Sequence, residues 1–147
     1  MTTTNANVDQ LNSFLRGEIS AVETYRQAID KLSGSTNATM LETWKRSHES
    51  RVALLRDRIT RLGGTPAESS GAWGAFAKLV EGGASILGEK VTISALEEGE
   101  DHGLHDYQAD IAKLDDDSRA FLTEKILPEQ QKTHNGLRNL KKVVTAH

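Results

Sequence analysis

Gly17-Glu18, followed by Tyr25 and then Leu32, is the stretch of sequence that decides the fold. The same residue types return with the same internal spacing as Gly99-Glu100, Tyr107 and Leu114. The two copies are offset by 82 residues, because 100 − 18 and 107 − 25 both equal 82. A repeat at a fixed offset indicates an architecture built from duplicated units. We therefore predict two similar halves.

A second echo follows each copy. Ser47-His48 with Leu54 matches Thr133-His134 with Leu140, at an offset of 86 residues, because 134 − 48 equals 86. Each half thus carries one Glu, one Tyr and one His in the same order.

Apolar residues recur every three or four positions along four stretches, which is the pattern of amphipathic helices. We predict helices over residues 7–32, 38–62 and 89–114, and a fourth that begins near Asp115–Ser118 and is split into two pieces at Pro128. The stretch 67–88 predicts a crossover that contains a short amphipathic helix over 72–87. Four long helices joined by one long crossover predict an all-α, ferritin-like four-helix bundle. Residues 1–6 are expected to be a disordered tail, and residues 7–147 a single domain.

Composition excludes several classes of function. The chain has no cysteine, so any metal ion must be held by oxygen and nitrogen ligands. The net charge of −3 argues against a nucleic-acid partner, and no apolar run has the roughly 20 residues that a membrane span needs. We expect a cytoplasmic protein that could form a homodimer. Helix 38–62 carries several arginines, which we interpret as a solvated face: Arg46, Arg51, Arg56, Arg58 and Arg61.

The repeated polar residues interrupt apolar stripes near the middle of each helix: Glu18, His48, Glu100 and His134. Buried charge is costly unless it is compensated. These side chains are therefore expected to meet in the core, either around a metal ion or in a closed polar network. One divalent ion with two carboxylates and two imidazoles would be neutral, and this donor set suits Fe, Mn or Zn. Glu97, one turn before Glu100, could add a ligand, and Tyr25 and Tyr107 are expected to orient the carboxylates as hydrogen-bond donors.

The first helix resembles that of bacterioferritin-type and other ferritin-like proteins. The chain is more similar still to a family of small bacterial ferritin-like proteins of undefined function, and the resemblance covers residues 8–142. Its shared motifs are Arg16–Tyr25, Leu62-Gly63-Gly64-Thr65-Pro66, Gly71-Ala72-Trp73-Gly74, and Leu127-Pro128 followed by His134. In the ferritin-like superfamily, each half gives one Glu from its first helix and a Glu-x-x-His from its second, and these residues hold two metal ions.

This chain departs from that pattern at two positions. Lys45 stands three residues before His48, and Gln131 three residues before His134, where the superfamily has glutamates. Two dications facing only two carboxylates would leave positive charge in the core, so a single ion is favoured.

The leading interpretation is a small metal-binding or degenerate metal-site protein, stress-associated and without turnover. One alternative is an iron oxidoreductase that reacts with oxygen or peroxide beside Tyr25 or Tyr107. The other is a non-catalytic structural or interaction module, in which the Glu–His pairs satisfy one another without metal.

Overall fold

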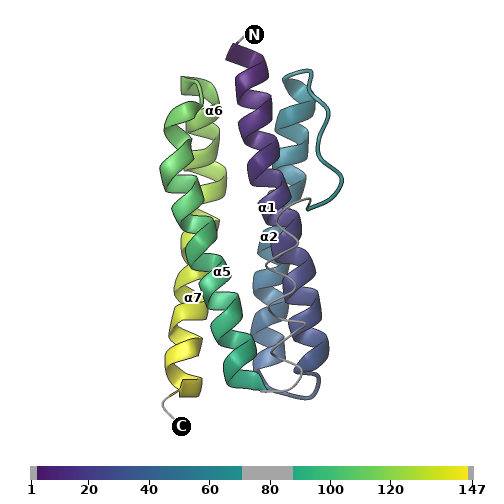
Figure 1. The fold of residues 1–147 in the computed structure, drawn as a ribbon, viewed down its shortest axis with the longest axis vertical. Helices are drawn as coiled ribbons and strands as arrows, with labels where there is room; N and C mark the ends of the chain where they lie inside the picture. The colour runs from purple at the N-terminus through teal and green to yellow at the C-terminus, as the bar shows by residue number, and fades with distance from the viewer. Residues whose placement is uncertain (1–2, 71–87, 146–147) are drawn as a thin grey trace.

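The computed structural model describes residues 3–70 and 88–145, and these residues form helices and no strand. The long helices are α1 (Thr3–Lys31), α2 (Asn37–Arg61) and α5 (Glu89–Asp110), the last extended by the 3₁₀ turn η3 (Ile111–Lys113). The fourth helical stretch consists of α6 (Asp116–Phe121), η4 (Leu122–Ile126) and α7 (Leu127–Thr145). Figure 1 shows these stretches side by side, so the predicted all-helical bundle is confirmed.

Two helix boundaries differ from the sequence prediction. Helix α1 begins at Thr3, four residues before the expected start at residue 7. Helix α5 ends at Asp110 and tightens into η3 before Leu114. The short helix expected over 72–87 lies outside the described residues.

The fourth helical stretch begins where the sequence indicates. The side chain of Asp115 accepts a hydrogen bond from the backbone N–H of Ser118, which caps the first turn of α6. The predicted break at Pro128 takes another form: η4 is π-helical, and the N–H of Leu127 bonds to the carbonyl of Leu122. Pro128 is the second residue of α7, directly after this wider turn. The wider π turn thus lets the helix pass the proline without separating into two pieces.

The helices pair as two antiparallel hairpins. Helix α1 packs mainly against α2 and α5 mainly against α7, whereas α1 and α5 touch each other less extensively. The side chains of Ser35 and Asn37, at the α1–α2 turn, each donate a 2.7 Å hydrogen bond to Glu89 at the start of α5. The two hairpins are therefore tied together at one end of the bundle.

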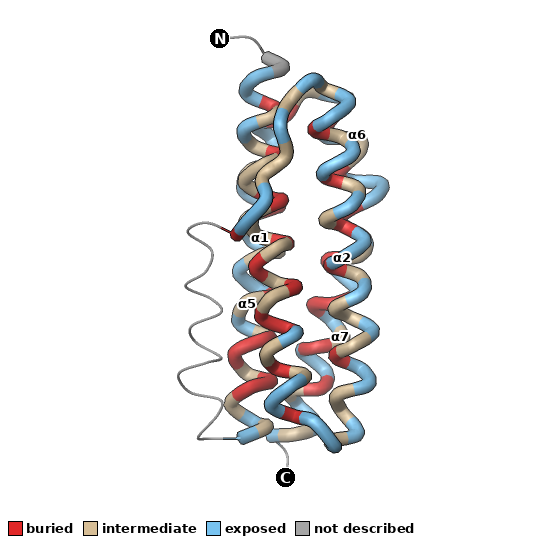
Figure 2. Tube along the Cα trace, turned by 90° about the vertical axis from the view of Figure 1, so that its right-hand side faces the viewer, coloured by how far each residue is buried: buried red, intermediate tan, exposed pale blue. Residues whose placement is uncertain are grey.

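The core contains two apolar clusters, and buried residues follow the inner face of every long helix (Figure 2). One cluster includes Tyr25, Leu41, Leu96 and Leu137. The other includes Leu15, Leu55, Tyr107 and Ile126. Buried polar residues from all four helical stretches lie between them. No helix in the described ranges combines the length and the apolar character required to cross a membrane.

Candidate functional site

Two glutamates and one histidine meet at the centre of the bundle. Glu18 from α1, Glu100 from α5 and His48 from α2 are each no more than 4% exposed. The His48 ring lies between the carboxylates: its Nδ1 is 2.5 Å from Oε1 of Glu18, and its Nε2 is 2.6 Å from Oε2 of Glu100. Three of the five predicted metal ligands are therefore in contact.

His134 and Glu97 do not reach this centre. His134 is buried, but its Nε2 lies 3.3 Å from Oδ1 of the exposed Asp101, and its Nδ1 has no hydrogen-bond partner in the described part of the chain. Glu97 lies 3.3 Å from the Lys141 ammonium. Both residues instead belong to the contact between α5 and α7.

The tyrosines connect the two halves. The Tyr25 hydroxyl on α1 donates a 2.5 Å hydrogen bond to Glu100 on α5, and the Tyr107 hydroxyl on α5 donates one of 2.5 Å to Glu18 on α1. This exchange follows the two-fold relation of the repeat. Burial and the adjacent carboxylates raise the pKa of both hydroxyls well above 10.0, so both remain protonated donors.

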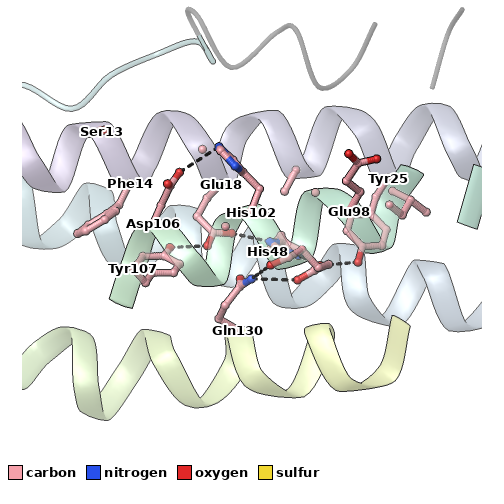
Figure 3. Close-up of a pocket in the computed structure, with 16 residues that line it drawn as sticks. Ser13, Phe14, Glu18, Tyr25, His48, Glu98, His102, Asp106, Tyr107 and Gln130 are labelled. Carbon is pink, nitrogen blue, oxygen red and sulfur yellow. Dashed lines mark hydrogen bonds and ion pairs between the residues drawn. The ribbon is translucent and has the colours of Figure 1, made fainter. Parts of the chain in front are cut away.

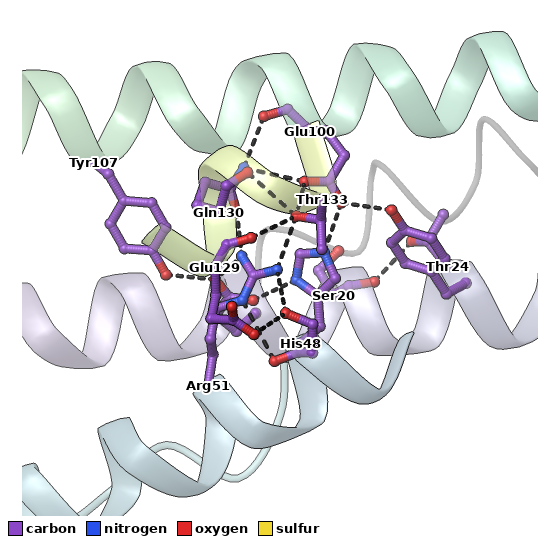
Figure 4. A network of polar contacts seen from close by, with 12 residues as sticks. Ser20, Thr24, His48, Arg51, Glu100, Tyr107, Glu129, Gln130 and Thr133 are labelled. Carbon is purple, nitrogen blue, oxygen red and sulfur yellow. Dashed lines mark hydrogen bonds and ion pairs between the residues drawn. The ribbon is translucent and has the colours of Figure 1, made fainter. Parts of the chain in front are cut away.

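Arg51, which the sequence pattern placed on a solvated face, is fully buried in the centre (Figure 4). Its Nη1 donates to Oε2 of Glu18 at 3.3 Å and to Oε1 of Gln130. Its Nη2 donates to the hydroxyls of Thr133 at 2.9 Å and Ser47 at 3.1 Å. The expected solvated face is thus wrong at Arg51, which supplies a positive charge that the sequence interpretation omitted, and Arg58 is also half-buried, with its guanidinium 5.6 Å from the centre of the Phe121 ring.

Gln130 and Thr133 complete the network from α7. The Gln130 amide donates to Oε1 of Glu100 at 3.2 Å and to its backbone carbonyl at 2.9 Å, and the Thr133 hydroxyl donates to Oε1 at 2.8 Å. Each of the four carboxylate oxygens of Glu18 and Glu100 therefore has at least one donor.

The protonation states follow from these contacts. Burial alone would raise the pKa of Glu18, but the charges of Arg51 and His48 outweigh it and hold the pKa at about 2. Burial would likewise raise the pKa of Glu100, and His48 lowers it overall. Ionised carboxylates only accept hydrogen bonds, so both ring nitrogens of His48 must donate, and the ring is an imidazolium. Consistently, the two glutamates raise the His48 pKa despite burial and Arg51. Two negative and two positive charges make the centre neutral.

The register of α7 explains why the sequence missed Gln130 and Thr133. The buried positions of α2 and α7 correspond at the offset of the main repeat: 130 − 48, 133 − 51 and 137 − 55 all equal 82. The sequence echo of His48 and His134 has an offset of 86, which is four residues too many. Four residues are about one helical turn, or about 6 Å along the axis. The offset of the Glu–Tyr repeat, applied to α2, would have identified both residues.

The arrangement was tested for its fit to a metal ion. Two glutamates and a histidine are compatible in composition with a metal site. However, His48 directs both nitrogens at carboxylates, and the guanidinium of Arg51 stands beside Glu18 and cannot be a ligand. Within the described ranges, no three His, Asp or Glu side chains are arranged to hold a metal. The cluster is therefore compatible with a metal site in composition, while in this structure both nitrogens of His48 are hydrogen-bonded to carboxylates.

Comparisons with known proteins identify the family. The model of a domain of unknown function, DUF2383, matches residues 6–113, which is most of the chain and includes Glu18, His48, Arg51 and Glu100. No curated protein and no solved structure matched. The chain therefore belongs to the DUF2383 family.

Proposed function

We propose that this protein is a non-catalytic structural module: a ferritin-like bundle in which two organic cations, the His48 imidazolium and the Arg51 guanidinium, take the place of metal ions. This proposal rests on one observation: the hydrogen bonds and the charges of the centre are completely paired. Every carboxylate oxygen of Glu18 and Glu100 has a donor, and the formal charges sum to zero. A buried ion network that is fully paired in this way needs no further ligand.

The spacing of the second helices supports this interpretation. Ferritin-like bundles place a Glu-x-x-His on each second helix. The residues that face the centre here have the same i, i+3 spacing, but they are His48-x-x-Arg51 on α2 and Gln130-x-x-Thr133 on α7. Each of these four positions, which differ from the positions 45/48 and 131/134 matched from the sequence, holds a side chain that donates hydrogen bonds to the carboxylates.

A bound divalent ion would also be electrostatically unfavourable here. The ion would have to displace the proton of His48, and its two positive charges would join that of Arg51 beside only two carboxylates. The centre would then carry a net charge of about +1 in a buried environment, where uncompensated charge is costly.

Metal content and thermal melts test the proposal. Protein purified without chelator should contain substoichiometric Fe, Mn and Zn, and its melting temperature should not rise when these ions are added. An ion that binds only the folded state at 100 times its dissociation constant would add about 2.7 kcal/mol to stability. One retained equivalent of metal, or a rise in melting temperature that Glu100→Gln abolishes, would establish the metal-binding protein predicted from sequence.

A matched positive control restores the ligands. The variant His48→Glu, Arg51→His, Gln130→Glu, Thr133→His installs Glu-x-x-His on both helices, and it should gain metal-dependent stability that the natural chain lacks. Because this variant could fail to fold, nitrogen-15 NMR of His48 in the natural chain gives a second readout. The proposal requires two protonated ring nitrogens near neutral pH, and a neutral or metal-bound ring would overturn it.

A further inference from the structure

The two hairpins present similar apolar faces to each other. Buried apolar positions recur at the offset of 82 residues, including these pairs: Leu11 and Ile93, Phe14 and Leu96, and Leu55 and Leu137. Apolar burial is non-directional, so such a face packs against any face of similar shape. The apolar contacts therefore distinguish poorly between the unlike hairpin of the same chain and the like hairpin of a second copy.

The charges at the centre are not repeated. Gln130 and Thr133 stand at the positions of α7 that correspond to His48 and Arg51 of α2, because 130 − 48 and 133 − 51 both equal 82. Figure 3 shows His48 and Gln130 close together in the space between Tyr107 and Tyr25, and both donate to the Glu100 carboxylate. One hairpin thus supplies cations at the positions where the other supplies uncharged donors.

Each hairpin consequently brings a different net charge to the centre. The α1–α2 hairpin contributes Glu18 and the two cations His48 and Arg51, so its face carries a net charge of +1. The α5–α7 hairpin contributes Glu100, so its face carries a net charge of −1. Glu129 lies at the edge of the centre and is 3.2 Å from the Lys132 ammonium, which balances its charge.

The three possible pairings of these faces differ in charge. An α1–α2 face against an α5–α7 face is neutral, as in the structure. Two α1–α2 faces would bring together a net charge of +2, and two α5–α7 faces a net charge of −2. Buried charge without a counter-charge is costly, so the unlike pairing is favoured over both like pairings.

We propose that the uneven placement of the two cations selects the partner of each hairpin: the α1–α2 face accepts a face with one net negative charge and rejects a copy of itself. Gln130 and Thr133 are then specificity-determining residues, because uncharged donors at these positions leave the α5–α7 face negative. A difference in affinity between right and wrong partners is what makes an interface specific. This inference rests on the structural role proposed above and explains why both cations lie on one helix.

Three full-length variants test the proposal by urea unfolding at pH 6, where the raised pKa of His48 keeps its proton bound. Gln130→His with Thr133→Arg gives both hairpins a charge of +1, and His48→Gln with Arg51→Thr gives both a charge of −1. Each double variant thus places a like pair inside one chain. The quadruple variant exchanges the two sets of residues and restores a neutral centre.

The quadruple variant should be more stable than either double variant, although it carries twice as many substitutions. Its ratio of folded to unfolded chains should exceed theirs by about a hundredfold, because each double variant leaves buried charge without a partner. A quadruple variant that is no more stable than the double variants would overturn the proposal.

A smaller exchange gives a second measurement that needs fewer substitutions. Arg51→Thr and Thr133→Arg together move only the guanidinium from α2 to α7, so the combined variant should be more stable than the sum of the two single losses allows. Thr133→Met is the matched control, because it places a long uncharged side chain at the same position and should give no such gain beside Arg51→Thr. Additive losses for the arginine exchange, or an equal gain with Thr133→Met, would contradict the proposal.

Chelator in every sample separates these results from the metal measurements described above. Bound metal or a neutral His48 ring in the natural chain would overturn the structural role itself. Additive losses in a metal-free chain whose His48 ring is protonated would overturn only the selection of partners by charge.

Discussion

Replacing Arg51 with methionine removes one of the two positive charges of the centre and keeps a long side chain in the same space. Glu18 loses its guanidinium partner, and the acceptors on Gln130 and Thr133 lose their charged donor. The centre then carries an uncompensated negative charge. Removing one partner of a buried ion pair costs about 3–5 kcal/mol. At about 2–4 °C per kcal/mol for a chain of this size, the melting temperature should fall by about 6–20 °C.

Urea unfolding followed by circular dichroism measures this loss as a change in midpoint with an unchanged slope. Arg56→Met is the matched control, because Arg56 is exposed on the same helix, and its effect should stay within about 0.5 kcal/mol. Adding Glu18→Gln to Arg51→Met restores neutrality, so the double variant should be more stable than the sum of the two single losses allows. A loss below about 1 kcal/mol for Arg51→Met, or simple additivity in the double variant, would refute the account of the centre.

Three further predictions follow from particular contacts. The free energy of unfolding should be greatest between about pH 4.5 and 6.5. Above pH 6.5 it should fall by up to about 1.4 kcal/mol per pH unit, because the raised pKa of His48 keeps its proton bound only in the folded state. Below pH 4.5 it should also fall, because Glu18 stays ionised down to about pH 2 only in the folded state. Tyr107→Phe removes a buried hydrogen bond to a carboxylate and should cost about 1.5–3 kcal/mol in urea unfolding. Gly136→Ala should be destabilising by about 1–3 kcal/mol in thermal melts, although alanine normally favours a helix, because its Cβ would lie 2.6 Å from the Trp44 ring.

Each of these has a control. The alkaline loss of stability should disappear in His48→Gln and persist in His105→Gln, an exposed histidine on α5; an unchanged pH profile in His48→Gln would argue against a buried imidazolium. Tyr107→Phe should leave the m-value unchanged, and a cost near zero would mean that the Glu18 carboxylate does not need this donor. Combining Gly136→Ala with Trp44→Leu should relieve the clash, so a double variant less stable than either single variant would contradict the packing argument.

Much of the bundle was predictable from short-range signals. The apolar periodicity and the Asp115 cap located the four helical stretches, because both depend on residues within one or two turns. The repeat of Glu18 and Tyr25 as Glu100 and Tyr107 also indicated that these side chains share one level. Tyr25 pairs with Glu100 and Tyr107 with Glu18, because the two copies have the same internal spacing and are related by a two-fold symmetry.

The burial of Arg51 was less accessible to sequence reasoning. Arginine is rarely buried without a partner, and the other arginines of α2 favoured a solvated face. The signal was its position three residues after His48 and four before Leu55, which places it on the buried face. Sequence reasoning could place Arg51 on this buried face only by treating the carboxylates of Glu18 and Glu100 as charge partners of its guanidinium.

The sequence by itself determined the four helices, their order and the two glutamates and two tyrosines at the centre, because these depend on local periodicity and on one exact-length repeat. The tertiary structure alone decided that Gln130 and Thr133, not His134, face those glutamates, and that Arg51 lies beside Glu18. The physical reason is that residues four apart share one face of a helix, so a pattern defines the face but not the turn. The turn is set by how far α7 slides along its neighbours, and that position depends on packing across the whole bundle.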